Sequence, residues 1–352
     1  YISYLNDEMS KPKTTIKHHL RFHHNDDIIN DELIRGLNGI LGHQKERNLA
    51  ESATYLRLSS EKGSSLASYI LGLLYESGKG VEANFEEAKR YYKESANQGN
   101  SYGYSKLGQC YEFGYGVGIN KDKSFKYYQK AANLDNPMGL NGLAHQYEEK
   151  DNKEAYKYYQ QAAAFGDSIG LSNVGYCYSN GIGVSKNEKK AFEYIKQAAE
   201  LGLPSAIRTL GICYEHSIGV KKDYLQAFKY YDKAAELGNS NAYNNLGLCY
   251  EEGIGVEPDQ EEAMHYFMEG SKLNNADSFY HLARHYQEGI GVTKDDKIAV
   301  QYLEKAAELG NSNTYSDIAD LYYDNGDYPK AAEYYQKAVD FGNMSALNNL
   351  GD

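Results

Sequence analysis

A short motif returns along the chain at a nearly constant interval, and this repetition constrains the fold more than any other feature. The motif is an aliphatic residue followed by Gly or Ala, and its copies begin at Leu71, Leu107, Leu143, Val174, Leu210, Leu246, Leu282, Ile318 and Leu350. The interval is 36 residues, except for 31 after Leu143 and 32 after Ile318. A fixed period of this length is typical of one supersecondary unit that is copied many times and stacked.

Tyrosine repeats in the same register. The chain has 36 Tyr and no Trp. One Tyr column stands three residues after the small residue of the motif, and a second column lies in the latter half of each unit. Because a buried hydroxyl needs a hydrogen-bond partner, we expect a ladder of tyrosine hydrogen bonds along the packed helices. The second column comprises Tyr91, Tyr127, Tyr158, Tyr194, Tyr230, Tyr266, Tyr302 and Tyr334.

The spacing inside each unit predicts two helices joined by a glycine-rich turn. The aliphatic residue and the Tyr four positions later share one helix face, and residues 227–235 illustrate the apolar stripe of the second helix. The segment Gly-x-Gly-Val, as at residues 253–256, closes the first helix, because Gly adopts positive φ at low cost. In the units that start at Pro137 and Ser312 this segment is missing, so we expect shorter turns there.

These columns resemble the Sel1-like repeat, a relative of the tetratricopeptide repeat. The resemblance rests on residues 246–256 and their copies, and it covers 64–343 as eight units and 344–352 as the first half of a truncated ninth. Residues 32–63 fit a degenerate first repeat, in which Ile40 stands 31 residues before Leu71. The resemblance implies an all-α fold, a right-handed α/α solenoid of helix-turn-helix repeats, and service mostly as an adaptor.

Stacking as in that family predicts where a partner would bind. The first helices would line a concave face, with the positions six and three before and one and four after the small residue directed into it. These positions vary from copy to copy beside uniform core columns, as expected for a binding groove laid on a repeated frame. The predicted partner-binding residues are Glu76, Tyr102, Gln109, Glu112, Asn141, His145, Glu148, Tyr176, Arg208, Glu215, Asn244, Glu251, Tyr280 and Arg284.

A glutamate column within this set has two interpretations. Its carboxylates form an acidic stripe for a basic, extended peptide, whose backbone is held by the amides of Asn141, Asn244 and Asn348. Alternatively, the Glu belongs to the repeat itself and solvates the helix end, since exposed ion pairs contribute only about 0–1 kcal/mol. The column comprises Glu76, Glu112, Glu148, Glu215 and Glu251.

The four cysteines share one column, directly before the first-helix Tyr. Copies stacked about 8–10 Å apart exceed the roughly 7 Å limit for a disulfide, so we expect small buried thiols rather than bridges. Secreted members of the family place a second Cys in each repeat, and its absence here favours a reducing compartment and a cytoplasmic location. The column comprises Cys110, Cys177, Cys213 and Cys249.

Other chemistry is weakly represented. Residues 1–31 form a basic segment or linker whose four His would hold a metal only if it were helical, and a solvated tail is favoured. The Gly-x-Gly-Val segments follow helices rather than strands, so they are not phosphate loops, and no catalytic set or cofactor motif appears. A formal charge of −12 argues against nucleic-acid binding. The sequence contains no run of about 18 apolar residues, so it predicts no membrane span.

The sequence therefore predicts an interaction scaffold rather than an enzyme. Its partner would be a protein or an extended peptide, with basic segments if the acidic stripe is functional. The alternative is the regulatory repeat region of a larger enzyme or signalling protein whose catalytic domain lies outside the fragment. That alternative rests on a chain that begins at Tyr1 without Met, and on a last unit that stops after its first helix.

Overall fold

The computed structural model describes residues 31–41, 48–311, 314–343 and 346 of the chain. Its secondary structure over these residues is α-helical without a strand, which confirms the predicted all-α repeat solenoid class. None of the described helices is both long enough and apolar enough to cross a membrane. The chain forms two compact units that divide between Lys186 and Asn187.

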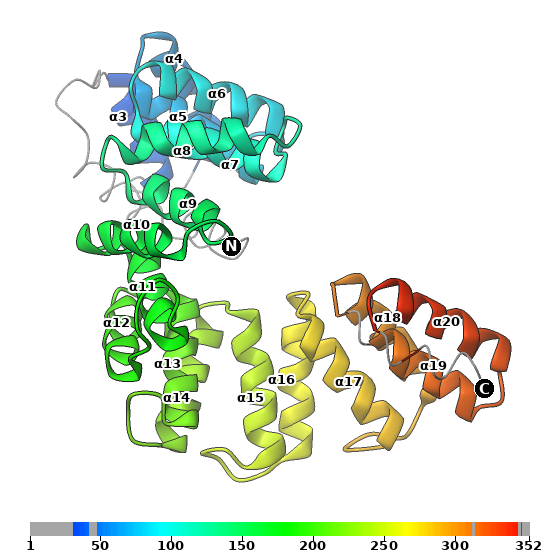
Figure 1. Cartoon of the computed structure of the whole chain (residues 1–352). Coiled ribbons are helices and arrows are strands. Elements are labelled where there is room, and N and C mark those ends of the chain that lie inside the picture. Colours follow the sequence, from blue (N-terminus) through cyan, green and yellow to red (C-terminus); the bar gives the residue numbers. More distant parts are fainter. Residues whose placement is uncertain (1–30, 42–47, 312–313, 344–345, 347–352) are drawn as a thin grey trace. The chain divides into compact units, whose positions relative to one another are not determined.

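The first unit contains nine of the described helices, and those adjacent in sequence pack against each other (Figure 1). They are α3 (Asp31–Leu41), α4 (Leu49–Glu61), α5 (Ser65–Ser77), α6 (Phe85–Asn97), α7 (Ser101–Phe113), α8 (Lys121–Ala132), α9 (Pro137–Tyr147), α10 (Asn152–Ala164) and α11 (Ser168–Asn180). The first helices of neighbouring repeats also touch, because α7 contacts α9 and α9 contacts α11.

The second unit repeats the same arrangement, and its helices follow one another side by side. They are α12 (Glu188–Glu200), α13 (Pro204–His216), α14 (Tyr224–Glu236), α15 (Ser240–Glu252), α16 (Gln260–Lys272), α17 (Ala276–Glu288), α18 (Asp296–Glu308), α19 (Thr314–Asp324) and α20 (Tyr328–Asp340). In this unit α15 contacts α17, again joining two first helices.

Glycine ends the helices as the sequence predicts. Helix α7 ends at Gly114 in the left-handed conformation, and α13 uses Ser217 at φ 63° in the same position. Asn or Asp side chains begin most helices by accepting backbone N–H groups, as Asn100 does from Tyr102 at 3.0 Å. These end signals fix each helix at about the same length, which keeps the repeats in register.

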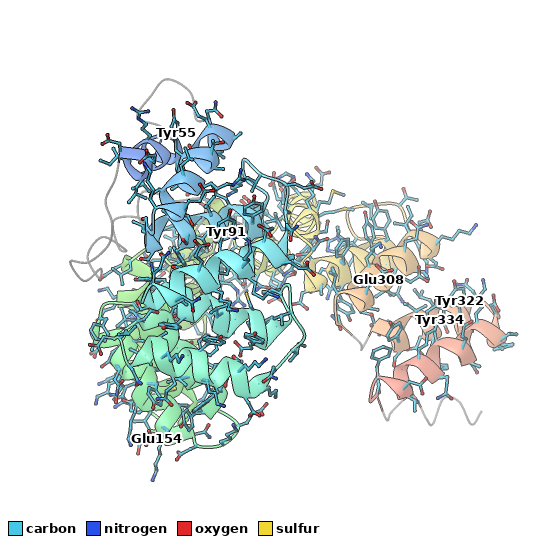
Figure 2. All side chains as sticks on the ribbon, turned by 90° about the horizontal axis from the view of Figure 1, so that it is seen from above. Tyr55, Tyr91, Glu154, Glu308, Tyr322 and Tyr334 are labelled. Atoms are coloured by element: carbon cyan, nitrogen blue, oxygen red, sulfur yellow. The ribbon has the colours of Figure 1, made fainter. Side chains whose placement is uncertain are left out.

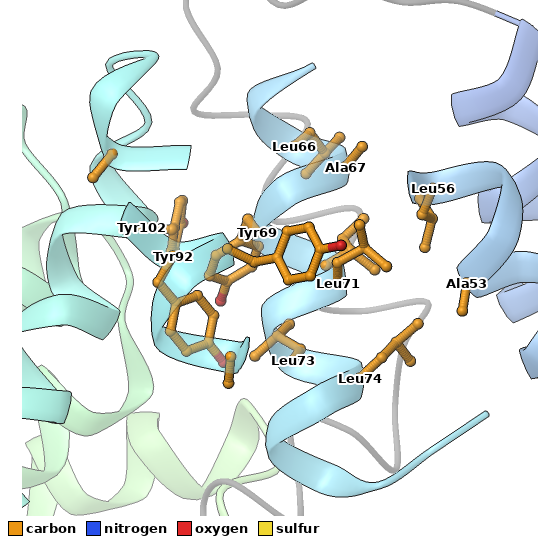
Figure 3. Packing of buried hydrophobic residues seen from close by; sticks show 14 of the residues in the cluster. Ala53, Leu56, Leu66, Ala67, Tyr69, Leu71, Leu73, Leu74, Tyr92 and Tyr102 are labelled. Atoms are coloured by element: carbon orange, nitrogen blue, oxygen red, sulfur yellow. The ribbon is translucent and has the colours of Figure 1, made fainter. Parts of the chain in front are cut away.

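Aromatic rings fill the space left by the small column. The Tyr92 ring lies so close to Gly72 that a Cβ there would overlap it, and the same holds for Tyr128 beside Gly108. Figure 3 shows Tyr69, Tyr92 and Tyr102 gathered on one side of α5, with Leu71 and Leu74 directed toward Leu56 and Ala53 of α4. The Leu-Gly motif is therefore the seam between the two helices of a repeat.

The second Tyr column stacks on the first. Tyr75 and Tyr91 lie 5.5 Å apart between ring centroids, and Tyr214 and Tyr230 lie at the same separation. Figure 2 shows a further pair, Tyr322 beside Tyr334, with centroids 5.6 Å apart. The described rings of this column are buried or half-buried. The prediction that tandem copies bury their phenol-bearing sides is confirmed.

Helix α3 corrects the predicted register of the degenerate first repeat. Gly36 lies against Leu56, so that a Cβ on Gly36 would stand 2.8 Å from Leu56 Cγ. Gly72 stands in the same relation to Tyr92, 36 residues later, so Gly36 takes the small position and Ile40 does not take the aliphatic one. The sequence concealed this because Arg35, not an aliphatic residue, precedes Gly36.

The Gly-x-Gly-Val turns, here called cover loops, have a second role. The second glycine of each lies against the backbone of the residue that begins the second helix of the preceding repeat. A side chain at this glycine would collide with that backbone, for example Gly116 with Phe85, except at Gly291, where an added Cβ would lie 3.4 Å from Gln260 O. The glycine and helix pairs are Gly80 with α4, Gly116 with α6, Gly183 with α10, Gly219 with α12, Gly255 with α14 and Gly291 with α16.

Two described second helices, α8 and α18, have no cover loop, because the following repeats carry the shortened turns. In the first of these turns, α9 ends at Tyr147 and α10 begins at Asn152. The first deletion therefore leaves the repeats intact but uncovers the start of α8. At α18, Asn325 of the shortened turn donates to Asp296, the first residue of the helix, at 3.5 Å.

Candidate functional site

A groove of about 480 Å³ lies in the first unit along the first helices α7, α9 and α11, and we call it the first-unit groove. Its wall combines carboxylates, amides and apolar rings. It comprises Glu112, Phe113, Tyr128, Met138, Asn141, Gly142, His145, Glu148, Tyr159, Asp167, Ile169, Asn173 and Tyr176. The structure thus brings together five of the predicted partner-binding residues, which are Glu112, Asn141, His145, Glu148 and Tyr176.

The first-unit groove is acidic. Glu112, Glu148 and Asp167 line it, whereas no Lys or Arg does. His145, which is 60% exposed, places Nδ1 3.1 Å from Glu112 Oε1. This hydrogen bond raises the pKa of His145, since the carboxylate stabilises the charged imidazole. Near neutral pH the wall therefore carries more negative than positive charge.

An amide in the groove wall has an unused acceptor. Asn141 Nδ2 donates to Asp167 Oδ2 at 2.7 Å, and the same Asp167 oxygen accepts from the Gly170 N–H at 2.8 Å to begin α11. Asn141 Oδ1 is buried and has no hydrogen-bond partner. A buried unpaired carbonyl oxygen costs about 1–3 kcal/mol.

Each groove glutamate accepts a tyrosine hydroxyl from the second helix of its own repeat. Tyr128 Oη donates to Glu112 Oε2 at 2.6 Å, and Tyr159 Oη donates to Glu148 Oε1 at 2.7 Å. Burial, followed by the nearby carboxylate, raises the pKa of Tyr159, so this phenol stays protonated and donates. These pairs are rungs of the predicted tyrosine hydrogen-bond ladder, which is confirmed here.

The same pair recurs outside the groove. Tyr92 donates to Glu76, which also lies 3.4 Å from the buried Nζ of Lys106. Tyr231 Oη donates to Glu215 Oε2 at 2.5 Å. In the last full repeat Tyr323 takes the Glu position, and Tyr335 donates instead to Asp320, one helical turn earlier.

The glutamate column and the second-helix Tyr that pairs with it change together along the chain. Where the acid is replaced by Ser179 or Gln287, the corresponding Tyr is replaced by Ile195 or Leu303. Glu251 is one exception, because its counterpart is Phe267, and the pair of Tyr323 and Tyr335 in the last full repeat is another. Arg284 forms the ion pair with Glu251, and His285 Nε2 lies 3.9 Å from Glu251 Oε2.

This pairing bears on the two interpretations of the glutamate column. Glu76, Glu112 and Glu251 are each only 14% exposed, and Glu215 is 16% exposed, so these side chains do not simply solvate a helix end. Each stabilises the fold through a buried or partly buried partner. Partner binding at the same carboxylates stays a prediction, and charge reversal would not test it cleanly because it would also break these pairs.

Three predicted partner-binding residues belong to the core instead. Tyr102 is 6% exposed and packs on Tyr69 with ring centroids 5.7 Å apart. Gln109 and Asn244 are 2% and 9% exposed. The helices of adjacent repeats pack closely at these positions, so the assumption that all four positions per repeat face the groove is wrong.

The predicted residues of the second unit form separate contacts. Arg208 Nε donates to Asn245 Oδ1 at 2.8 Å, joining α13 to α15, and burial lowers the pKa of Arg208. Tyr280 is half-buried, and Arg284 pairs with Glu251. Among the cavities described here, none gathers these residues as the first-unit groove gathers its own.

The four cysteines are buried and free, as predicted. Burial raises the pKa of Cys110 and Cys249 to about 12, and that of Cys177 and Cys213 to about 11. Because the thiolate is the nucleophile and the metal ligand, the raised pKa values disfavour the reactive form of these thiols near neutral pH. In the described part of the chain, no group of three or more His, Cys, Asp or Glu is placed to hold a metal.

Sequence reasoning missed Asp167, the acid that joins the groove to α11. The sequence held a signal for it. The N-cap residue just before the first helix is Asn in four repeats, at positions 100, 136, 239 and 275, but it is Asp only at position 167. The basic segment 1–30, Asn348 and most of the half repeat lie outside the described residues.

Comparison with known proteins assigns the repeats. The family model described as Sel1 repeat matches residues 65–100, 101–136, 138–167, 168–203, 204–239, 240–275, 276–311 and 319–343. Among proteins with curated descriptions, none matches this chain.

Two solved structures are similar over most of this chain. One is c5321, a protective antigen present in uropathogenic Escherichia coli strains that displays an SLR fold; it is 29% identical with a TM-score of 0.54, over 91% of this chain and 70% of that one. The other is a Sel1 repeat protein from Oxalobacter formigenes, 29% identical with a TM-score of 0.55, over 83% of this chain and 86% of that one. Since the matched repeats cover more than half of its residues, the chain belongs to the Sel1 repeat family.

Proposed function

We propose that this chain is a non-catalytic scaffold that binds an extended, basic peptide segment of a partner protein in the first-unit groove. Sel1 repeats generally serve as protein-interaction scaffolds. The proposal adds a location, which is the groove on α7, α9 and α11, and a ligand chemistry, which is a Lys or Arg side chain on an extended backbone.

The charge of the wall supports a basic ligand. Three carboxylates line the groove without a Lys or Arg, and the whole chain carries a formal charge of −12. Met138, Ile169 and Tyr176 add apolar surface, which suits the methylene stem of a Lys or Arg while its charged end meets the carboxylates. Complementary charge also speeds association and rejects acidic partners.

The acidic wall is the single observation that carries the proposal, because Glu112, Glu148 and Asp167 line the groove without a Lys or Arg. The groove is large enough for a peptide side chain and its flanking backbone. An extended peptide presents a backbone N–H at every second residue along one edge, and the carboxylates and amides of the wall are acceptors for such donors.

The absence of catalytic activity and the reducing, cytoplasmic location belong to the same proposal. Protonated, buried thiols supply no nucleophile, which supports a binding role. Four unpaired cysteines in one column suit a compartment that keeps thiols reduced.

The test begins with selection of random linear peptides displayed on phage against the immobilised chain. We expect the selected peptides to be enriched in Lys or Arg next to aliphatic residues. The affinity of one selected peptide is then measured by fluorescence anisotropy for the wild type and for Tyr176→Lys. This substitution adds a cation to the groove without touching a Tyr–Glu pair, and we expect it to weaken binding at least about tenfold.

Tyr328→Lys is the matched control, since Tyr328 is 60% exposed in the second unit and Tyr176 is 56% exposed. The control should bind the peptide like the wild type. Selected peptides without basic enrichment, or equal affinity for the Tyr176→Lys variant, would contradict the proposal.

A further inference from the structure

A second cavity of about 480 Å³ lies in the first unit where the repeat beginning at Pro137 lacks its cover loop. We call it the notch. Lys121 and Phe125 from the start of α8 form one side, and Gln146, Glu149 and Lys150 from the end of α9 and the following turn form the other. The notch borders the first-unit groove, with which it shares Glu112, Phe113 and His145.

The neighbouring repeats show what normally occupies this position. In the next repeat, Gly183 lies against the backbone of Asn152 and the Cβ of Tyr156, which are the first and fifth residues of α10. In the second unit, Gly219 lies against Glu188 and Phe192, the first and fifth residues of α12. The first and fifth residues of α8 are Lys121 and Phe125, and both line the notch.

A loop that packs on the start of a second helix needs particular residues and a particular backbone shape. Its backbone approaches so closely that only glycine fits, because a Cβ at Gly183 or Gly219 would collide with the helix backbone. The Val after this glycine packs on the core in the cover loops at Val117 and Val292. A tight turn with a positive-φ glycine followed by a branched aliphatic residue therefore matches the shape.

Charge does not select the occupant of the notch. Lys121, Lys126 and Lys150 line it together with Asp122 and Glu149, so both signs are present at the rim. Phe125 supplies an apolar floor, over which Lys150 Nζ lies 6.0 Å from the ring centroid. Recognition would depend on backbone shape and apolar contact, which differs from the acidic first-unit groove.

We propose that the notch is a docking site for a Gly-x-Gly-Val-like turn of a partner protein, which enters in trans where the chain's own cover loops pack in cis. A second copy of this chain does not supply the turn, because each cover loop in the described residues already packs on its own chain. The proposal is independent of the first-unit groove, since it names another cavity and another ligand chemistry.

The probe is a backbone-cyclised peptide with the sequence of residues 215–223, which contains the turn Ser217-Ile218-Gly219-Val220. Cyclisation pre-forms the turn and lowers the entropy cost of binding. The reporter is 4-fluorophenylalanine incorporated at position 125 of the full chain, observed by fluorine NMR. We expect a saturable shift of this signal as the peptide is added.

Two controls decide the interpretation. The same cyclic peptide with Gly219→Ala should bind at least about tenfold more weakly, since its methyl group meets the start of α8. A chain in which residues 148–151 are replaced by the longer turn of residues 215–223 restores the 36-residue interval and fills the notch in cis. This loop-restored chain should keep its helicity by circular dichroism and give no saturable shift.

Three results would overturn the proposal. They are no saturable shift at position 125, equal affinity of the alanine peptide, and undiminished binding by the loop-restored chain. If the loop-restored chain failed to fold, the comparison of the two peptides on the wild type would still decide. The Tyr176→Lys variant tests the first-unit groove at a residue that does not line the notch, so the two proposals fail separately.

Discussion

At the residue scale, the tyrosine–carboxylate pair is the main polar contact between the two helices of a repeat. It occurs in the first unit at Tyr128 with Glu112 and in the second at Tyr231 with Glu215. The requirement for a partner followed from burial of the hydroxyl, so the ladder was predictable. Its acceptor was not, because the sequence places that Glu on the same helix face as the positions directed toward a partner.

Replacing Tyr231 by Phe removes the donor and leaves Glu215 in a poorly solvated site. Because Tyr231 is 0% exposed, we expect a loss of about 1–3 kcal/mol in the free energy of unfolding. Urea unfolding followed by circular dichroism measures this. Tyr224→Phe in the same helix, where the ring is 43% exposed, should change stability by less than about 0.5 kcal/mol. Equal effects of the two substitutions would refute a structural role for the pair.

A half-buried histidine predicts acid sensitivity of the second unit. Burial lowers the pKa of His281 from 6.5 to about 4; Asp277 opposes this shift and His285 reinforces it. As the pH falls below 6.5 the unfolded chain takes up a proton that the folded chain does not, so stability is present above that pH and is lost toward pH 4. We expect a loss of about 2 kcal/mol between pH 7 and pH 5 from this group.

The variant His281→Phe keeps a ring against Phe267, whose centroid lies 4.7 Å away, but cannot take up the proton. Urea midpoints measured between pH 4 and pH 8 should therefore fall less steeply for this variant than for the wild type. His145→Gln is the control, because the pKa of His145 is raised rather than lowered. An unchanged acid slope in His281→Phe would remove His281 as the cause.

At the element scale, two glycines per repeat meet different demands. Those that follow the second helices, such as Gly202, have positive φ and open space around the missing Cβ. The second glycine of each cover loop, such as Gly219, has positive φ and also lies against the preceding repeat. The sequence indicated the conformational demand at both, but the steric demand depends on a neighbouring repeat and became visible only in the structure.

The two demands separate experimentally. Gly202→Ala should cost about 1 kcal/mol, the usual penalty for a non-glycine residue at positive φ. Gly219→Ala carries the same penalty and also forces the cover loop away from Glu188, so its cost should be at least about 2 kcal/mol larger. Thermal unfolding midpoints of the two variants provide the comparison, and equal midpoints would contradict the steric role.

The elements themselves were largely predictable, and the exceptions have physical causes. Periodicity and glycine positions gave the helix pairs and the shortened turn after Tyr147. The notch was not foreseen, because a deletion in one repeat opens a space against α8 of the preceding repeat. The burial of Tyr102 and Gln109 was also predicted wrongly, because these positions vary between copies like surface residues but lie in the core.

At the scale of the whole molecule, stability is built from contacts between neighbours in sequence. Within each unit, the helix contacts join helices that are adjacent in sequence, or the first helices of adjacent repeats. A perturbation should therefore stay local, as in other repeat arrays.

Hydrogen exchange of the Tyr231→Phe variant tests this locality. We expect faster exchange at the amides of α13 to α15 and unchanged rates at α5 to α7, with mass spectrometry of peptic fragments as the measurement. A uniform acceleration over both units would indicate that the chain opens as a single cooperative body instead.

The cover loops also set an order in time. Helix α6 begins at Phe85, and the glycine that covers it, Gly116, follows 31 residues later; the same lag separates Glu188 from Gly219. During translation, each repeat whose successor carries a cover loop thus leaves the ribosome unfinished and is completed only when that successor emerges. Helix α8 has no cover loop to follow it. The start of this helix, which is exposed while the chain is being made, therefore stays exposed in the folded chain and lines the notch.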